Sequence, residues 1–336
     1  MSFQVKRIYY GLHSVSVTAY NPCFPSAGSC GSLMQSVGIN ASTEYEQVFE
    51  LGRVGIYANI EGIPTAEVTV ERAMTIETFG RLWTLGGGSG SGAAEKIDNT
   101  TYTINMGIRP EGGCSATSAS GFVQCNGAVL SSYTMNFGTD GPLTESATFI
   151  GNQIGWTSGV PGLTETDPDE PPSGIVLNRQ HVIGGGPFAT NSNALQSASF
   201  SISLDREDVV ALGDRFPVLR PINFPIEATA EFEYLAGGSG TTYGLSFNPD
   251  EAGGQVPGGV AGQQPGVWLG VRIPTGGGGY GSPKYIYLEK AFLTSSNYSG
   301  GDAGGGNATI SHSYTNYEGL GVNSSLPSNI NGTFTT

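Results

Sequence analysis

The chain has 336 residues, which is enough for about two domains of ordinary size. It contains 53 Gly, only 12% charged residues and 38% hydrophobic residues, and its net charge is −14. The hydrophobic fraction with so little charge excludes a disordered chain, and the acidic balance argues against a protein that holds nucleic acid by its phosphates, which requires clustered Lys and Arg. Aromatic and β-branched residues between Gly-rich stretches predict a mainly β fold with long loops.

Membrane and export signals are missing from the sequence. No run of about 20 apolar residues occurs, so we expect no membrane-spanning helix and no membrane insertion. The N-terminus, MSFQVKRIYYGLHSVSV, has no apolar segment followed by a small-residue cleavage site, so we expect no signal peptide.

The first segment alternates from Phe3 to Val17 and predicts one or two strands, followed by the loop NPCFPSAGSCGS. All the cysteines lie in Gly-, Ser- or Pro-rich stretches of the first half: Cys23, Cys30, Cys114 and Cys125. Two loop-closing disulfides, Cys23–Cys30 and Cys114–Cys125, are one interpretation. Free thiols, as expected in a reducing cytoplasm, are the other. A metal site is not favoured, because neither pair has C-x2-C spacing and no His lies nearby.

Residues 35–71, QSVGINASTEYEQVFELGRVGIYANIEGIPTAEVTVE, predict a strand, a short helix and a second strand. The expected helix spans residues 43–51, because Thr43 followed by Glu46 fits a capping box and Gly52 fits a helix C-cap. Pro64 then opens a strand with alternating apolar residues.

The same stretch recurs 161 residues later, as QSASFSISLDREDVVALGDRFPVLRPINFPIEATAEFE. A second helix is expected there, beginning at Ser203 or Asp205 and closed by Gly213, and the strand after it slips by one residue between the copies. The identities at this spacing join Gln35, Ser36, Ser42, Glu46, Val48, Leu51, Gly52 and Pro64 to Gln196, Ser197, Ser203, Glu207, Val209, Leu212, Gly213 and Pro225. So many matches at one spacing predict two copies of one unit.

Further matches extend the repeat. At a spacing of 163, Gly107, Arg109, Ala128, Leu130 and Ser132 meet Gly270, Arg272, Ala291, Leu293 and Ser295; Ala147-Thr148-Phe149 also falls opposite Ala308-Thr309-Ile310. The acidic, Pro-rich stretch TETDPDEPPSG between the halves reads as a linker. We therefore predict a first module over residues 1–160, a linker over 161–175 and a second module over 176–336. Each module is a β-sandwich or barrel with one short flanking α-helix.

Catalytic motifs are not visible. The three histidines, His13, His181 and His312, form no metal-binding or catalytic spacing, and no nucleophile elbow occurs. The stretch GGGSGSG lacks the Lys and the helix of a phosphate-binding loop, so we expect a flexible loop, no cofactor and no enzymatic activity.

The stretches FELGRVGIYANIEGIPTAEVTVE and DREDVVALGDRFPVLRPINFPIEATAEFE resemble the tube-protein module of phage tails and contractile injection systems. The matching framework is Leu51, Gly52 and Pro64 in the first copy and Leu212, Gly213 and Pro225 in the second. The resemblance covers most of both halves and brings no catalytic residue with it.

The resemblance implies a structural virion protein, assembled in the host cytoplasm, that forms rings with itself and contacts other tail proteins. Stacked rings would form a tail tube through which DNA passes without specific binding, and an acidic wall suits such a channel. With a doubled module, three chains make a pseudo-hexameric ring, which we favour over six chains.

Two alternative functions remain. One is a tail-end or baseplate-hub ring of the same fold. The other is a two-domain β-sandwich adhesin that recognises carbohydrate through loop aromatics such as Trp156, Trp268 and Tyr280.

Overall fold

The computed structural model describes residues 10–19, 28–29, 33–52, 54–85, 101–110, 121–157, 175–185, 195–235, 266–275, 279–300 and 308–326. The fold is mainly β, as predicted, and the strands pair in antiparallel sheets. The strands are β1 Tyr10–Ala19, β2 Gly28–Ser29, β3 Met34–Phe49, β4 Ile56–Ala73, β5 Tyr102–Pro110, β6 Gly121–Gly138, β7 Thr144–Gly151, β8 Gln153–Thr157, β9 Val182–Gly185, β10 Leu195–Ser203, β11 Glu227–Leu235, β12 Val267–Val271, β13 Pro274–Thr275, β14 Gly279–Tyr280, β15 Lys284–Leu288, β16 Phe292–Ser299, β17 Thr309–Asn316 and β18 Leu320–Asn323. Helix α1 spans Arg81–Leu85, and a 3-10 turn spans Arg179–His181.

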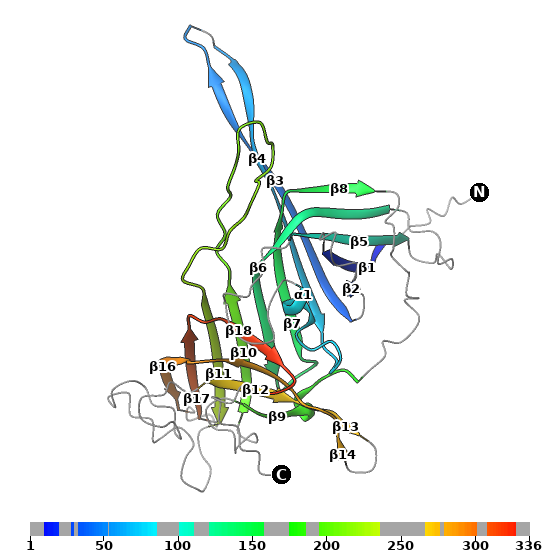
Figure 1. Cartoon of the computed structure of the whole chain (residues 1–336), viewed down its shortest axis with the longest axis vertical. Coiled ribbons are helices and arrows are strands. Elements are labelled where there is room, and N and C mark those ends of the chain that lie inside the picture. The colour runs from blue at the N-terminus through cyan, green and yellow to red at the C-terminus, as the bar shows by residue number, and fades with distance from the viewer. Residues whose placement is uncertain are drawn as a thin grey trace, which may run out of the picture.

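Eight strands form one continuous antiparallel sheet in the order β3-β4-β7-β6-β10-β11-β17-β16, here called the main sheet (Figure 1). The first four strands come from the first half of the chain and the last four from the second half. Both groups have the same internal order: the fourth strand along the chain lies between the second and the third, as in β3-β4-β7-β6 and β10-β11-β17-β16. The pairing of β6 with β10 joins the two groups.

Irregularities in the two groups also match. The β6–β7 register shifts between Leu130 and Ser132, and the β16–β17 register shifts between Leu293 and Ser295. Gly127 (φ 63°) lies where β6 bends, and Lys290 (φ 49°) lies in the turn between β15 and β16. Since bulges and left-handed residues re-aim strands, these shared positions bend both groups in the same place.

Smaller sets of strands accompany each group. Strands β2, β1, β5, the first part of β6, and β8 are neighbours in that order, and a separate sheet has the order β9-β12-β15-β18 (Figure 1). In the first half, the single long strand β6 pairs with β5 and β8 of the smaller set and also with β7 of the main sheet. In the second half, two strands share these positions: β15 belongs to the separate sheet and β16 to the main sheet.

One apolar core extends across the junction between the two groups. Phe137, Phe200, Phe232 and Tyr314 form a chain of edge-to-face rings, with centroid distances of 6.2, 5.5 and 6.0 Å, that crosses from β6 to β17. In the first half, Trp83 of the α1 helix packs on Tyr133 at 5.5 Å. The halves therefore share their core, and the linker stretch 161–174 lies outside the described residues.

Both predicted helices are wrong. Residues 43–49 continue strand β3, which pairs with β4 as far as Phe49 and Ile56. Residues 204–226 form an irregular hairpin with bridges between Arg206 and Ile222 and between Val209 and Leu219. We call residues 44–63 arm 1 and residues 204–226 arm 2; arm 1 extends beyond the sheet in Figure 1.

The physical reason is that a helix C-cap and a hairpin turn demand the same backbone. Gly52 (φ 86°) and Gly213 (φ 97°) are left-handed, as a helix C-cap would require, but each lies at the tip of an arm. The segment TEYEQVFE also contains aromatic and β-branched residues, Tyr45, Val48 and Phe49, which favour a strand.

The strand pairings refine the repeat. Ser36 pairs with Glu71 and Ser197 with Glu233, so the predicted one-residue slip of the second strand is present. The predicted match of Phe149 with Ile310 is wrong: Phe149 pairs with Leu130 and Val68, and in the second group Tyr314 takes the corresponding place beside Leu293 and Ala230. The reason is that the connection from β6 to β7 differs in length from the connection from β16 to β17, so a fixed spacing between the two halves does not hold there.

The core assignment predicts unequal costs for two truncations. Phe200 is fully buried at the centre of the ring chain, so we expect Phe200→Ala to reduce the free energy of unfolding by about 3–5 kcal/mol. Leu212, at the exposed tip of arm 2, is the matched control, and Leu212→Ala should change it by less than about 0.5 kcal/mol. Urea unfolding followed by circular dichroism measures both, and equal losses would contradict this assignment of the core.

Candidate assembly and channel surfaces

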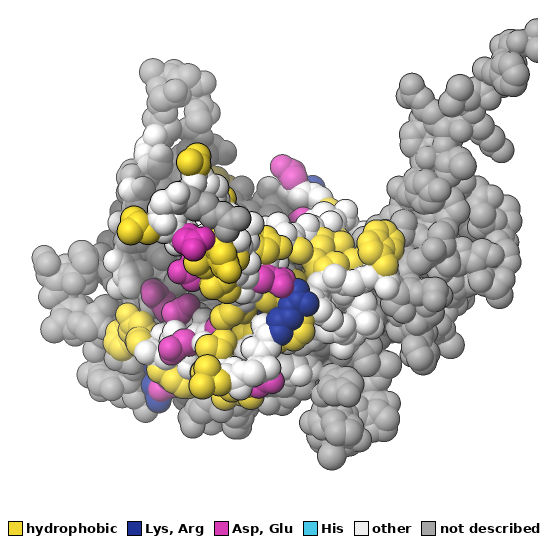
Figure 2. All heavy atoms as spheres, turned by 90° about the horizontal axis from the view of Figure 1, so that it is seen from above, with side chains coloured by type: hydrophobic (Ala, Val, Ile, Leu, Met, Phe, Trp, Pro, Cys, Tyr) yellow, Lys and Arg dark blue, Asp and Glu magenta, His cyan; other side chains and the backbone are white. Residues whose placement is uncertain are grey.

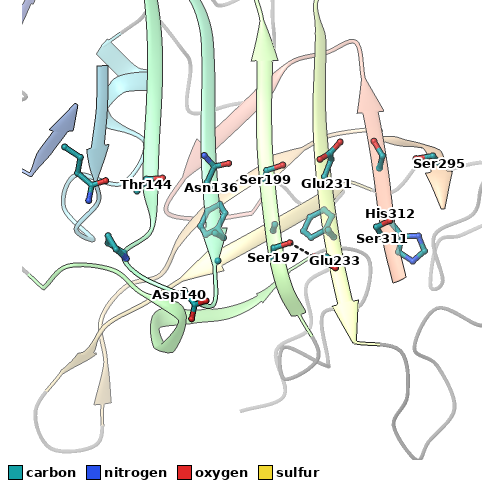
Figure 3. A pocket seen from close by; sticks show the side chains of 17 residues that line it. Asn136, Asp140, Thr144, Ser197, Ser199, Glu231, Glu233, Ser295, Ser311 and His312 are labelled. Atoms are coloured by element: carbon teal, nitrogen blue, oxygen red, sulfur yellow. Dashed lines mark hydrogen bonds between the residues drawn. The ribbon is translucent and has the colours of Figure 1, made fainter. Parts of the chain in front are cut away.

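The side of the main sheet that faces away from the core is polar, and we call it the polar face. One row of directly opposed residues crosses six strands and consists of Thr144, Asn136, Ser199, Glu231, Ser313 and Ser295. Figure 3 shows the labelled members of this row side by side on neighbouring strands. Side chains alternate between the two sides of a strand. The apolar neighbours of this row along β6, β10 and β11, such as Phe137, Phe200 and Phe232, therefore point into the core.

The charges on the polar face have one sign. Its carboxylates include Glu67, Glu71, Glu231 and Glu233. Ser36 donates a hydrogen bond to Glu71 (3.0 Å), and Ser197 donates one to Glu233 (3.2 Å), so the same pair recurs in both groups. Across the eight strands, as the structure describes them, there is no Lys, and the single Arg lies on the core side.

The polar face is hollowed across the junction of the two groups of strands. A hollow of about 860 Å³ is lined mainly by Ser, Asn and Glu side chains, including those of Asn136, Ser197, Glu231 and Glu233 (Figure 3). His312 borders it, but its ring is buried on the core side, and burial lowers its pKa. The hollow therefore presents hydroxyl, amide and carboxylate groups.

Arg72 on β4, the single Arg of the eight strands as described, forms a buried ion pair with Glu145 on β7. Arg72 Nε lies 3.0 Å from Glu145 Oε1, and neither side chain is exposed. Tyr133 donates a hydrogen bond to Glu145 (2.9 Å), and the Leu82 N–H donates another (3.4 Å). Arg72 also donates to the Thr78 carbonyl (3.1 Å), so this cluster fixes the α1 segment to the sheet. Burial raises the pKa of Glu145 to about 7, against the opposing effects of Arg72 and Tyr133.

The two arms expose many large apolar side chains. In arm 1 these are Tyr45, Phe49, Leu51, Val54, Ile56, Tyr57, Ile60 and Ile63; in arm 2 they are Val209, Val210, Leu212, Val218, Leu219 and Phe224. Figure 2, which looks down on the arms, shows hydrophobic and acidic side chains interspersed on this end of the molecule. Glu61 of arm 1 and Arg215 of arm 2 form an ion pair, so the arms lie side by side. An exposed surface of this kind is typical of a protein–protein contact.

Two arginines, the buried Arg220 and the half-buried Arg206, fix the base of arm 2 to the first group of strands. Arg206 Nε donates to the Leu130 carbonyl (2.7 Å), and Arg220 donates to Asn152 Oδ1 (2.8 Å). Arg220 also pairs with Asp208 at 2.6 Å. Arm 2 is thus part of the contact between the two groups of strands.

Neither edge strand of the main sheet, β3 or β16, pairs with a further strand among the described residues. Ile39 on edge strand β3 is 43% exposed, whereas Phe200, at the matching place on the internal strand β10, is 0% exposed. On the opposite edge, Phe292 of β16 is exposed. The sheet therefore ends in apolar side chains on both sides of the chain.

The predicted framework residues lie on the arms and at their bases. Leu51 and Leu212 are fully exposed beside the tip glycines Gly52 and Gly213. Pro64 is buried inside β4, next to a register shift at the base of arm 1, and Pro225 is exposed before β11. The prediction that Pro64 opens a strand is therefore wrong, because β4 begins eight residues earlier at Ile56.

The cysteines are described in part. Cys125 lies on β6 and not in a loop; its thiol is free and buried, and burial raises its pKa to about 11. The predicted Cys114–Cys125 disulfide is therefore not formed in this structure, because the buried Cys125 is unpaired. Cys23, Cys30 and Cys114 lie outside the described residues, so the Cys23–Cys30 pairing stays a prediction.

The other polar candidates have structural surroundings. His181 is buried, and its Nδ1 accepts a hydrogen bond from the Asn178 N–H (3.1 Å). Within the described ranges, no three His, Cys, Asp or Glu side chains come close enough to hold a metal ion. The described helices are also too short to cross a membrane.

The aromatic residues suggested for carbohydrate recognition do not gather at one loop surface. Trp268 lies on β12 and is 1% exposed, so its assignment as a surface loop aromatic is wrong. Trp156 on β8 is 74% exposed, and Tyr280 stacks under Arg272, whose guanidinium carbon is 3.7 Å from the ring centroid. The polar face was not predicted from the sequence, although the Ser/Thr/Glu alternation in QSASFSIS and EATAEFE indicates it.

These surfaces define a class: a β-sheet scaffold with an acidic polar face, two uncovered edges and two apolar arms. No protein-family profile and no curated protein matches the chain. Among solved structures, the chain is similar to one from the cryo-EM structure of the anti-feeding prophage (AFP) baseplate, 6-fold symmetrised. The sequence identity is 13% and the TM-score is 0.32; the match covers 47% of this chain and 97% of that chain.

The buried Glu145 predicts a pH-dependent stability. Its pKa is higher in the folded state than in the unfolded state, so the folded protein binds the proton more tightly. The free energy of unfolding should therefore fall as the pH rises from about 4.5 to about 7, by an amount on the order of 3 kcal/mol. Glu145→Gln should lose this slope, measured as urea unfolding at pH 5 and 7.5.

Glu231→Gln is the control for that measurement, because it removes an exposed carboxylate from the polar face. It should leave the difference between pH 5 and pH 7.5 as in the wild type. An unchanged slope in Glu145→Gln would contradict the assignment.

Proposed function

We propose that this chain is a structural protein of a phage-tail-like particle and that it forms the rings of a tail tube, with DNA passing through the channel. The observation that carries the proposal is the main sheet itself. It combines an acidic face free of basic side chains, in the eight strands as described, with two uncovered apolar edges.

The doubled arrangement supports two copies of one tube module. The strand order, the register shifts at Ser132 and Ser295, and the left-handed residues Gly127 and Lys290 recur in both groups. Irregularities such as these are specific to a fold, so their recurrence favours a tandem duplication over two unrelated sheets.

A ring removes the exposed edges. If each chain supplies two modules, three chains close a ring with pseudo-six-fold symmetry, and every sheet edge is covered by a neighbour. A ring of six chains would instead place one module of each chain outside the inner wall. The continuous main sheet favours three chains, because both modules already lie side by side in one wall.

The chemistry of the polar face suits a channel for DNA. Carboxylates repel phosphates, and Ser, Thr and Asn offer only weak contacts, so the described side chains of this face let DNA pass without holding it. The role is structural, without catalysis or a cofactor. Other tail proteins bind at the arm end, and assembly takes place in the host cytoplasm.

A tail-end or baseplate-hub ring is the second candidate. The arms differ in chemistry: arm 2 carries the half-buried Arg206 and the buried Arg220, and arm 1 has Tyr45 and Asn59 at the matching positions. Unequal arms favour a ring that meets a different protein at its arm end, as the last ring of a tube would.

Negative-stain electron microscopy of the purified chain tests the proposal. We expect rings with a central hole, and mass photometry should give three chains per ring. Stacked rings would support the tube and single rings would support the tail-end candidate. A monomer that persists at high protein concentration would overturn both.

Charge reversal tests the channel. We expect Glu67→Lys/Glu231→Lys to form rings that retain short double-stranded DNA at low salt, because the new ammonium groups contact phosphates. Glu77→Lys/Asp214→Lys makes the same change of charge away from the polar face and should retain much less. Gel-shift titration measures both, and equal retention by the two variants would contradict the assignment of the polar face to the channel.

A further inference from the structure

We propose that edge strand β16 of one chain pairs with edge strand β3 of another copy, antiparallel and in the register that the internal β6–β10 contact sets. The inference rests on the proposed ring and adds the residues that hold two chains together. In this register, Ser42 lies opposite Ser295, Asn40 opposite Asn297, and Ile39 opposite Tyr298.

The internal contact supplies the template. Strand β6 closes the first group and pairs with β10, which opens the second: Ser203 faces Ser132, and Phe200 faces Met135. Strands β16 and β3 hold the same places at the outer ends of the two groups. Each β10 residue corresponds to the β3 residue 161 positions earlier, and each β6 residue corresponds to the β16 residue 163 positions later. Replacing the residues of each β6–β10 pair in this way gives the proposed register.

Burial gives independent support. On β10, the core-side residues Ala198, Phe200 and Ile202 are buried because β6 covers them. On β3, Ile39 and Ala41 of the matching row are exposed. The core therefore continues to the edge of the chain, and another copy of β16 would cover it as β6 covers β10.

The edges also lack the usual protection. Exposed edge strands normally carry charges or Pro that prevent pairing with another chain. The segment Ser36–Ser42 (SVGINAS) and strand β16 (FLTSSNYS) contain neither a charged residue nor Pro. Two unprotected edges of matching length on one chain fit pairing with a second copy.

The base of arm 1 completes the contact. Arm 2 is fixed over Leu130 of β6 by Arg206. At the matching places, arm 1 has the exposed Tyr45, and β16 begins with Phe292 and Leu293. The contact between chains is thus apolar at the place where the internal contact uses the half-buried Arg206.

Cysteine pairs in the full chain test the register. Asn40→Cys/Asn297→Cys should form disulfides between chains under mild oxidation, with a three-chain species as the main product on a non-reducing gel. Asn40→Cys/Ser296→Cys is the matched control, because position 296 points to the opposite side of the sheet and should give little product. The wild-type chain shows the background from its own cysteines.

A second variant covers the edge without oxidation. Ile39→Asp should abolish ring formation and leave a monomer with the circular dichroism spectrum of the folded chain, because Ile39 is already half exposed in the single chain. Val218→Asp makes the same change on exposed arm 2, away from the edge, and should still form rings.

The outcomes separate the two proposals. Rings without the Asn40–Asn297 cross-link, or with equal cross-linking in the control pair, would overturn the register and leave the tube proposal standing. Rings formed by Ile39→Asp would overturn the use of this edge. Wild-type chains that neither form rings nor cross-link would overturn both proposals.

Discussion

The pairing of β6 with β10 is the constraint on which the rest of the fold depends. It joins two groups of four strands and continues the core from Phe137 to Phe200. It also keeps the polar side chains of both groups on the same side of the sheet. A slip of one residue would turn Phe200 to the polar face and Ser199 to the core. The register is therefore fixed by the burial of the ring chain and by the arginine contacts at the base of arm 2.

This constraint also explains where charge is tolerated. Carboxylates occur freely on the polar face because water reaches them there. On the core side the exception is Glu145, which requires Arg72, Tyr133 and the Leu82 N–H as partners. The partners offset only part of the cost of burial, so the pKa of Glu145 is still raised. The second group has Tyr234 and Ile310 at the corresponding positions, so an apolar pair serves the same fold.

The sequence indicated the β class, the repeat and the one-residue slip, because these follow from alternation and from identities at fixed spacing. It misplaced the helices, because a left-handed Gly after Leu51 fits a helix end and a hairpin tip equally well. The polar face could have been inferred from the Ser/Thr/Glu alternation in QSASFSIS and EATAEFE. The contacts of Arg206 and Arg220 could not, because they join residues about 70 positions apart or more.

Doubling the module gives the chain two kinds of contact from one geometry. Inside the chain, Leu130 lies in the same polypeptide as Arg206, so this contact forms at a high effective concentration. That contact tolerates the half-buried Arg206 and the buried Arg220, whose desolvation is costly, because chain connectivity already favours it. A contact between separate chains has no such help and must gain more from apolar burial. The exposed Tyr45, Ile39 and Phe292 at the two free edges meet that requirement, and the arginines remain at the internal junction.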